Sequence, residues 1–154
     1  MVAELGDEAE AALEEVRSLA QGVYPSLLAD EGLAVALQAL GRRSTPVARV
    51  TSDGVGRFPP EIESAVYFCC LEALQNVAKH APNARSVSIS LHVDNALLFE
   101  VRDDGGGFAR DSVRPGLGFA SMHDRIAAVG GRLTIHSEPG GGTTVTGSVP
   151  LEGA

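Results

Sequence analysis

The chain has 154 residues, of which 44% are hydrophobic and 21% are charged, so it can bury a core and does not have the composition of a disordered tail. The formal net charge of −8 and the absence of Trp argue against nucleic-acid binding through phosphate contacts or base stacking. Neither a signal-peptide pattern nor an apolar run near the roughly 20 residues that span a bilayer occurs, and the adjacent Cys69 and Cys70 cannot build a disulfide framework. A cytoplasmic protein is therefore expected.

The first half of the chain is predicted to be mainly helical. Residues 7–21 have a helix-forming composition and carry much of the acidity of the chain. Residues 32–40 are expected as a second helical segment, ended by Gly41-Arg42-Arg43, and residues 47–51 are expected as a strand. A long helix is predicted over about residues 59–80, because it begins with a Pro-Pro pair and Pro is tolerated in the first turn of a helix.

The second half is predicted to be mainly β-structure. Residues 86–93 carry apolar side chains at odd-numbered positions up to Val93 and polar ones at even-numbered positions, the pattern of a half-buried strand. The elements expected after it are a returning strand over residues 96–103, a helix over 119–129 and a hairpin of 132–137 and 143–150. This order favours an α+β fold in which helices cover one face of a mixed, largely antiparallel sheet, preceded by a helical arm.

Four polar residues share one face of the long helix. They lie at i, i+4, i+7 and i+8 and are Glu72, Asn76, Lys79 and His80. One interpretation is an ordinary solvated face. The other is a site for a metal–phosphate complex, because an acid and an amide supply oxygen ligands for Mg²⁺ and the two basic side chains suit phosphate oxygens.

Asp103 interrupts the apolar pattern of its strand. It continues the face of Leu97, Phe99 and Val101, which is expected to be buried, and a buried carboxylate is costly unless a donor meets it. Either the strand frays here and Asp103 caps the turn, or the carboxylate accepts a hydrogen bond from an amino group of a ligand. Thr143 shares the inward face of the last strand and bonds either its own backbone or a ligand.

Two glycine clusters, residues 105–107 and 116–118, bracket a loop whose backbone could approach phosphates closely. Each cluster alone is weak evidence. A dinucleotide-binding fingerprint is disfavoured because Arg110 stands where its third glycine is required, and no P-loop sequence occurs. The histidines are scattered and offer no zinc spacing.

Four segments together resemble the ATP-binding motifs of sensor histidine kinases and occur in the order of that family. EALQNVAKH, from residue 72, resembles the N box, and DDGGGF, from residue 103, resembles the first glycine box. GLGFASMHDR, from residue 116, resembles the second glycine box, and SEPGGGT, from residue 137, resembles the closing Gly-x-Gly-Thr segment. The short loop between the glycine boxes and the Asn-x-x-Lys-His ending of the N box resemble those of the subfamily related to nitrate-responsive and membrane-fluidity sensor kinases.

The resemblance implies a Bergerat-type ATP-binding domain, which is a two-layer α/β sandwich. Asp103 would accept the adenine amino group and Asn76 would ligate Mg²⁺. Lys79 and His80 would lie near the phosphates, and Glu72 would be the catalytic base or polarising group.

The other site residues implied by the resemblance are supporting and backbone groups. Gly105 and Gly107 would line the adenine and ribose side, and Thr143 would support Asp103. Gly116 and Gly118 would give backbone donors to the phosphates. The segment of the second glycine box that would bind ATP is Gly116, Leu117 and Gly118.

The resemblance further implies a protein-histidine kinase that transfers the γ-phosphoryl group of Mg·ATP to a histidine on a dimerisation helix. Residues 1–40 would be the end of the dimerisation helices and a linker, and residues 41–154 would be the catalytic domain. The acceptor is expected outside this chain, because no histidine precedes His80.

The expected partners are a response regulator and the dimerisation helices of a homodimer, with no nucleic acid and no membrane contact by this fragment. Whether the full-length protein is anchored in a membrane is left open. Two alternative functions also stay open: a regulatory module that binds ATP without chemistry, and a serine kinase of the anti-sigma-factor type.

Overall fold

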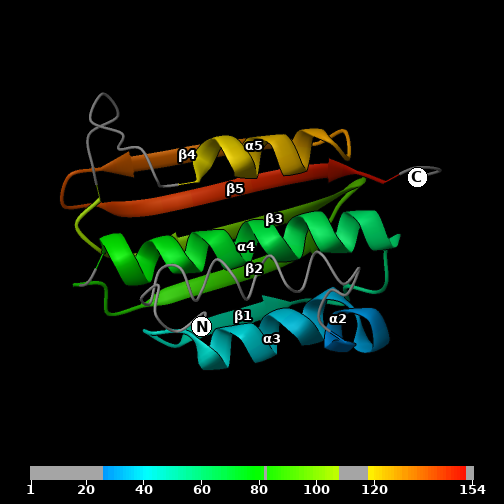
Figure 1. Ribbon diagram of the computed structural model, residues 1–154, viewed down its shortest axis with the longest axis horizontal. Helices are drawn as coiled ribbons and strands as arrows, with labels where there is room; N and C mark the ends of the chain where they lie inside the picture. Colours follow the sequence, from blue (N-terminus) through cyan, green and yellow to red (C-terminus); the bar gives the residue numbers. More distant parts are fainter. Residues whose placement is uncertain (1–25, 82, 108–117, 152–154) are drawn as a thin grey trace, which may run out of the picture.

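The protein is a five-stranded sheet with helices packed against it (Figure 1). The computed structural model describes residues 26–81, 83–107 and 118–151. The helical arm expected over residues 7–21 lies outside these ranges, as do Gly116 and Leu117.

The strands form one mixed sheet in the order β1-β2-β3-β5-β4. β1 is parallel to β2, and the other three pairings are antiparallel, which confirms the expected sheet. The strand bounds are β1 Ala48–Ser52, β2 Val87–Val93, β3 Ala96–Asp103, β4 Arg132–Glu138 and β5 Gly142–Pro150. Each strand agrees with its predicted range to within one residue at either end.

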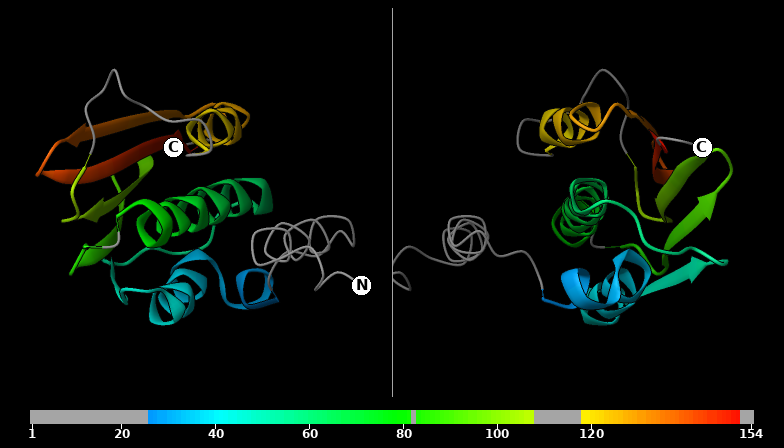
Figure 2. Two further views of the ribbon diagram at one scale, coloured as in Figure 1. Left: turned by 60° about the vertical axis from the view of Figure 1, so that its left-hand side comes forward. Right: turned by 90° about the vertical axis from the view of Figure 1, so that its right-hand side faces the viewer.

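Helices cover one face of this sheet. The helix bounds are α2 Ser26–Glu31, α3 Leu33–Arg43, α4 Pro60–His80 and α5 Phe119–Ala127. In the left view of Figure 2, α3, α4 and α5 lie on the same side of the strands, which confirms the predicted two-layer arrangement. The short α2 is not among the predicted elements, because its 6 residues are too few to display a helical period.

The prediction that the second helical segment ends at Leu40 is wrong, because α3 includes Gly41-Arg42-Arg43. Gly41 lies inside α3, and a Cβ on this residue would stand 2.7 Å from the carbonyl oxygen of Ala48 on β1. The glycine therefore allows α3 to pack closely on β1, and the helix continues to Arg43.

The core lies between the helices and the sheet. Ile89, Leu97 and Phe99 of the sheet and Val66 of α4 are at most 1% exposed. Phe99 pairs with Gly147 of β5, where the Cβ of any larger residue would overlap the phenyl ring. Gly147 thus makes room for the largest side chain at the centre of the sheet.

Val93 shares the face of its β3 partner Leu97, but it is not buried as its period predicts. It is 40% exposed, although the other apolar residues of β2 are buried. β1 pairs with β2 only as far as Leu91, so Val93 has a neighbouring strand on one side alone.

α2 and α3 contribute to the same core as α4 and the sheet. Leu28, Leu33 and Leu37 are fully buried in it. The domain boundary expected after residue 40 stays a prediction. Of the helices that the structure describes, none is long and apolar enough to cross a membrane.

Candidate functional site

A pocket opens where the last turns of α4 pass over the end of β3 and the start of β5. Its volume is about 40 Å³. The predicted site residues that line it are Asn76, His80, Asp103, Gly107 and Thr143. The rest of its lining is mostly apolar and consists of Ala73, Val77, Ala81, Val101, Phe119 and Val145. A few polar groups that converge on an apolar wall are typical of a small-molecule site.

The Asp103 carboxylate is the buried acid of this pocket. Asp103 is only 7% exposed, which confirms that it continues the inward face of β3. Burial raises the pKa of this carboxyl group, the amides of Gly105 and Thr143 lower it, and the charge of Asp104 raises it; the net shift is upward. The ionised form therefore lacks full compensation for its lost hydration and is suited to accept an N–H from a ligand.

Asp103 also caps the turn that follows β3. Its Oδ1 accepts a hydrogen bond from the backbone N–H of Gly105 at 2.8 Å. The strand nevertheless continues through Asp103 without fraying. The two interpretations of this residue are thus compatible, because one carboxylate oxygen can close the turn while the group lines the pocket.

Asp104 has the opposite environment. Its Oδ1 accepts hydrogen bonds from the backbone N–H groups of Arg85 at 2.7 Å and Ser86 at 3.0 Å, and the residue is exposed. Hydrogen bonds from Ser86 and Arg85 hold the pKa of this carboxyl group below its ordinary value. Asp104 therefore fastens the start of β2 to the end of β3 and lies outside the pocket lining.

Thr143 lies directly opposite Asp103 in the β3–β5 register. Its Oγ1 is 2.9 Å from Oγ of Ser137 on β4, and that Ser137 hydroxyl donates to the Gly142 carbonyl oxygen at 3.1 Å. Since a hydroxyl has one proton, Thr143 is the donor to Ser137. Thr143 thus acts on Asp103 through its backbone amide, while its side chain contacts β4.

The first glycine box packs against the β4–β5 turn. Gly107 has a φ of +64°, and a Cβ there would overlap the carbonyl oxygen of Glu138. Gly106 accepts a hydrogen bond from the N–H of Gly140 at 2.6 Å. Gly105 is buried beside Ala81, where a Cβ would stand 2.6 Å from the methyl group. Gly107 therefore brings backbone, rather than a side chain, to the pocket wall, whereas Gly105 and Gly106 lie outside the lining.

The polar face of α4 divides into two parts. Asn76 and His80, one turn apart, line the pocket, whereas Lys79 is exposed and is not part of the lining. Glu72 points toward the start of α5: its Oε2 lies 2.6 Å from the position that a Cβ on Gly118 would occupy. The structure thus brings Asn76 and His80 to Asp103 and places Glu72 at the neighbouring helix end.

The donor set fits Mg²⁺ bound together with phosphates. Among the described residues, no group of three or more His, Cys, Asp or Glu side chains could hold a metal ion. Mg²⁺ needs few protein ligands when substrate phosphates supply the others. The Asn76 side chain lines the pocket, and its amide oxygen is a hard ligand of the required kind.

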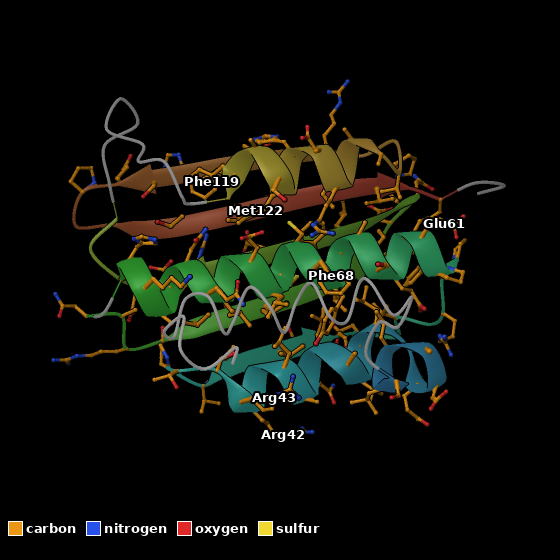
Figure 3. The ribbon with its side chains drawn as sticks, in the orientation of Figure 1. Arg42, Arg43, Glu61, Phe68, Phe119 and Met122 are labelled. Carbon is orange, nitrogen blue, oxygen red and sulfur yellow. The ribbon has the colours of Figure 1, made fainter. Side chains whose placement is uncertain are left out.

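Phe119 is a lining residue outside the predicted set. It is the first residue of α5 and directly follows Gly118, the left-handed N-cap with a φ of 73°. Figure 3 labels it on α5, together with Met122 one turn later. Its position next to a glycine box is the sequence signal that could have identified it, because a flat apolar side chain there suits contact with a base.

Comparison with known proteins identifies relatives of this chain. Residues 61–153 match the family model described as histidine kinase-, DNA gyrase B-, and HSP90-like ATPase. The chain is 35% identical over 147 residues to the oxygen sensor histidine kinase NreB of Staphylococcus carnosus and 34% identical over 149 residues to the sensor histidine kinase MctS of Rhizobium johnstonii. Both alignments cover 90% of this chain but only 42% and 32% of the two curated relatives.

Solved structures share the fold. The histidine kinase domain of the Erythrobacter litoralis EL346 blue-light activated histidine kinase superposes with a TM-score of 0.59 at 27% identity, over 68% of this chain and 54% of that chain. A second structure of the EL346 kinase gives a TM-score of 0.60 at 26% identity, over 68% of this chain and 35% of that chain. The predicted fold class is therefore confirmed.

Proposed function

This chain belongs to the family of histidine kinase-, DNA gyrase B- and HSP90-like ATPases, and we propose that it binds Mg·ATP in the pocket between α4, β3 and β5 and transfers the γ-phosphoryl group to a histidine. The acceptor lies on a dimerisation helix outside the chain and passes the phosphoryl group to a response regulator. The observation that carries the proposal is the buried Asp103 carboxylate, with its raised pKa, on the wall of a mostly apolar pocket.

Asp103 recognises adenine in this proposal. The 6-amino group of adenine donates a hydrogen bond, whereas guanine presents a carbonyl oxygen at the same position. A carbonyl facing the carboxylate would leave two acceptors together without a proton, so the site prefers ATP over GTP. Val101 and Val145 supply apolar contacts for the faces of the base, and Phe119 closes the same pocket.

Asn76 and His80 belong to the phosphate side. Asn76 holds Mg²⁺ through its amide oxygen, and the bound ion neutralises charge on the phosphates. His80 lines the pocket one turn further along α4, in reach of the same groups. Lys79 is exposed beside it and contributes positive charge at the pocket edge.

Glu72 is the proposed base or polarising group for the acceptor histidine. It lies one helical turn before Asn76 on the same face of α4. A carboxylate there can hold the N–H of an incoming imidazole so that the other ring nitrogen attacks the phosphorus. A module that only binds ATP would need Asp103 but not Glu72, and the presence of both favours the kinase.

Titration calorimetry tests the binding step. ATP is expected to bind the parent chain with Mg²⁺ and more weakly with EDTA. Asn76→Ala is expected to lose most of the difference between these two conditions, because the amide oxygen that ligates Mg²⁺ is removed. Gln75→Ala is the matched control, since Gln75 is the preceding residue of α4 and is not part of the pocket lining.

Two results would contradict the proposal. Absence of ATP binding by the parent chain with Mg²⁺ present would refute the nucleotide site. An Asn76→Ala variant that binds Mg·ATP like the parent would refute the metal role. Transfer of labelled phosphate to a separately supplied phosphoacceptor domain then distinguishes a kinase from a module that binds ATP without chemistry.

A further inference from the structure

α4 and α5 lie side by side over the sheet (Figure 3). Their contact includes a cation, the Arg125 guanidinium. Arg125 is in the last turn of α5, and its Cζ lies 5.2 Å from the centre of the Phe68 ring on α4. Phe68 is only 5% exposed, and the Nε atom of Arg125 is itself buried. A guanidinium held against an aromatic face inside a helix–helix contact has a fixed position, unlike most surface arginines.

Glu72 follows Phe68 by one turn of α4, so the two side chains are neighbours on the helix surface. The Glu72 carboxylate faces the N-terminus of α5, where a Cβ on Gly118 would stand 2.6 Å from its Oε2. This end of α5 has no acidic residue in its first turn and no side-chain cap. The carboxylate of α4 therefore supplies the negative charge that the start of α5 lacks.

Cys69 follows Phe68 on α4 and is fully buried. Burial raises the pKa of the Cys69 thiol to about 12, the Glu72 charge adds to this rise, and the Arg125 charge opposes it. Both charges act on the same thiol, which agrees with the placement of Arg125 on the Phe68 ring and of Glu72 one turn further along α4.

We infer that Arg125 is a positioning residue for Glu72: stacked on Phe68, it holds the carboxylate at the start of α5. The inference rests on the proposed role of Glu72 in phosphoryl transfer. It adds one consequence: the N-terminus of α5 and the Glu72 carboxylate of α4 keep a fixed position relative to each other. Arg125 is not part of the pocket lining, so in this inference it acts through Glu72.

The test is a double-mutant cycle on kcat and KM for transfer of labelled phosphate from ATP to a supplied phosphoacceptor domain. Glu72→Gln is expected to lower kcat by about 100-fold or more, the contribution typical of a general base. Arg125→Met is expected to lower kcat about tenfold, within the range of coupling energies between residues that act as one unit, with KM for ATP nearly unchanged. The double variant is expected to be no slower than Glu72→Gln alone.

Three further variants separate positioning from a merely structural role. Arg125→Lys keeps the charge and is expected to recover most of kcat, and Phe68→Leu, which removes the stacking surface, is expected to give an intermediate loss. Arg132→Met, an exposed arginine of β4, is the matched control and is expected to behave like the parent. Circular dichroism and the melting temperature identify any variant that fails to fold, and Arg125→Lys with Phe68→Leu still decide the question in that case.

Each contrary result has a distinct meaning. Losses that multiply in the double variant, or an Arg125→Met variant in which only KM changes, would overturn the inference and leave the proposed function intact. An Arg125→Lys variant as slow as Arg125→Met would do the same. A Glu72→Gln variant with the kcat of the parent would overturn both the inference and the catalytic role of Glu72, whereas ATP binding by the parent would still support the nucleotide site.

Discussion

Among the residues that the structure describes, two carboxylates are buried, and they are satisfied in different ways. Glu63, in the first turn of α4, is 0% exposed and accepts hydrogen bonds from Arg57 Nε at 3.1 Å, an Arg57 terminal nitrogen at 3.2 Å and the Phe58 N–H at 3.2 Å. Asp103, opposite the other end of α4, has Gly105 and Thr143 amides near it and a pocket in front of it.

The difference separates a structural acid from a ligand-binding one. Arg57 also donates to the carbonyl oxygens of Ala29 at 3.0 Å and Asp30 at 3.4 Å, so the ion pair joins the last turn of α2 to the start of α4. The buried Glu63 carboxylate is paired with the Arg57 guanidinium and serves the fold. Asp103 meets only backbone amides, and a ligand can supply the donor that the fold leaves out.

Arg57→Met is expected to give the largest effect on stability. It leaves the Glu63 carboxylate buried without its cation, and breaking such pairs costs about 3–5 kcal/mol in free energy of unfolding. We expect about 2–3 kcal/mol here, because 52% of the Arg57 side chain is exposed and water can partly replace it. Urea unfolding followed by circular dichroism measures the loss.

Arg102→Met is the matched control for this prediction. Arg102 is 64% exposed and its nearest carboxylate, on Glu100, is 4.0 Å away. Its removal is expected to change stability by less than about 1 kcal/mol. Equal losses of unfolding free energy in the two variants would show that the Arg57–Glu63 pair stabilises the fold no more than a surface ion pair does.

Asp103→Ala is expected to act on nucleotide preference more than on stability. The carboxylate that accepts the adenine amino group is lost, so ATP affinity should fall by about tenfold or more. GTP affinity should fall less, so the ATP-over-GTP ratio shrinks. Titration calorimetry with both nucleotides measures the ratio, and the melting temperature shows whether the turn at Gly105 has been disturbed.

Asp103→Asn sharpens the same test. An amide in place of the carboxylate can donate to the guanine carbonyl oxygen, so the preference is expected to move toward GTP beyond what Asp103→Ala shows. If Asp103 only caps the turn, both variants would lose stability and keep the ratio of the parent. An unchanged ratio would therefore remove Asp103 from adenine recognition.

Elements and site residues were predictable where a local pattern determines them. The alternation of β2 and β3 predicts both strands. It also places Asp103 on the buried face, because residues two apart in a strand share a face and Val101 is buried. Asn76 and His80 reach the same pocket because they lie one turn apart on α4. In these cases, short-range geometry is enough.

Features that depend on contacts distant in sequence could not be predicted. Arg57 and Glu63 carry no periodic signal, and their partners Ala29 and Asp30 come from a helix too short to recognise. Gly41 is a helix end by composition, but its close approach to β1 keeps it inside α3. Tertiary packing overrides the local preference in both places.

The pH dependence of stability should separate Asp103 from its neighbour Asp104. The pKa of Asp103 is raised in the folded protein, so its contribution to stability is full below its unfolded pKa and is lost as the pH rises through the folded value. The pKa of Asp104 is lowered, so its contribution is present above its unfolded pKa and is lost as the pH falls through the folded value.

Unfolding in urea between about pH 3 and pH 7 measures both contributions, with Asp103→Asn and Asp104→Asn as the paired variants. Relative to the parent, Asp103→Asn should gain stability as the pH rises, and Asp104→Asn should lose it. If both variants gained stability, or both lost it, as the pH rises, the contrast would be wrong. The contrast is that burial disfavours the ionised Asp103 carboxylate, whereas backbone amides stabilise the ionised Asp104 carboxylate.

Thr143→Val is expected to give the smallest effect and tests how far the contrast between structural and ligand-binding groups extends. The resemblance to sensor kinases implies that Thr143 supports Asp103 at the adenine, whereas its hydroxyl here donates to Ser137 on β4. Valine keeps the shape and the backbone amide beside Asp103, so ATP affinity should change by less than about threefold. Stability should fall by about 1 kcal/mol, because the hydroxyl of Ser137 loses its donor.

Ser137→Ala distinguishes the two roles of the Thr143 hydroxyl. It removes the partner on β4 and frees the hydroxyl to turn toward the pocket, while Thr143 remains opposite Asp103. If the hydroxyl serves only the β4–β5 contact, Ser137→Ala and Thr143→Val should lower stability alike and leave ATP affinity near that of the parent. A loss of ATP affinity of about tenfold in Thr143→Val alone would instead place the hydroxyl, directly or through a water, on the nucleotide.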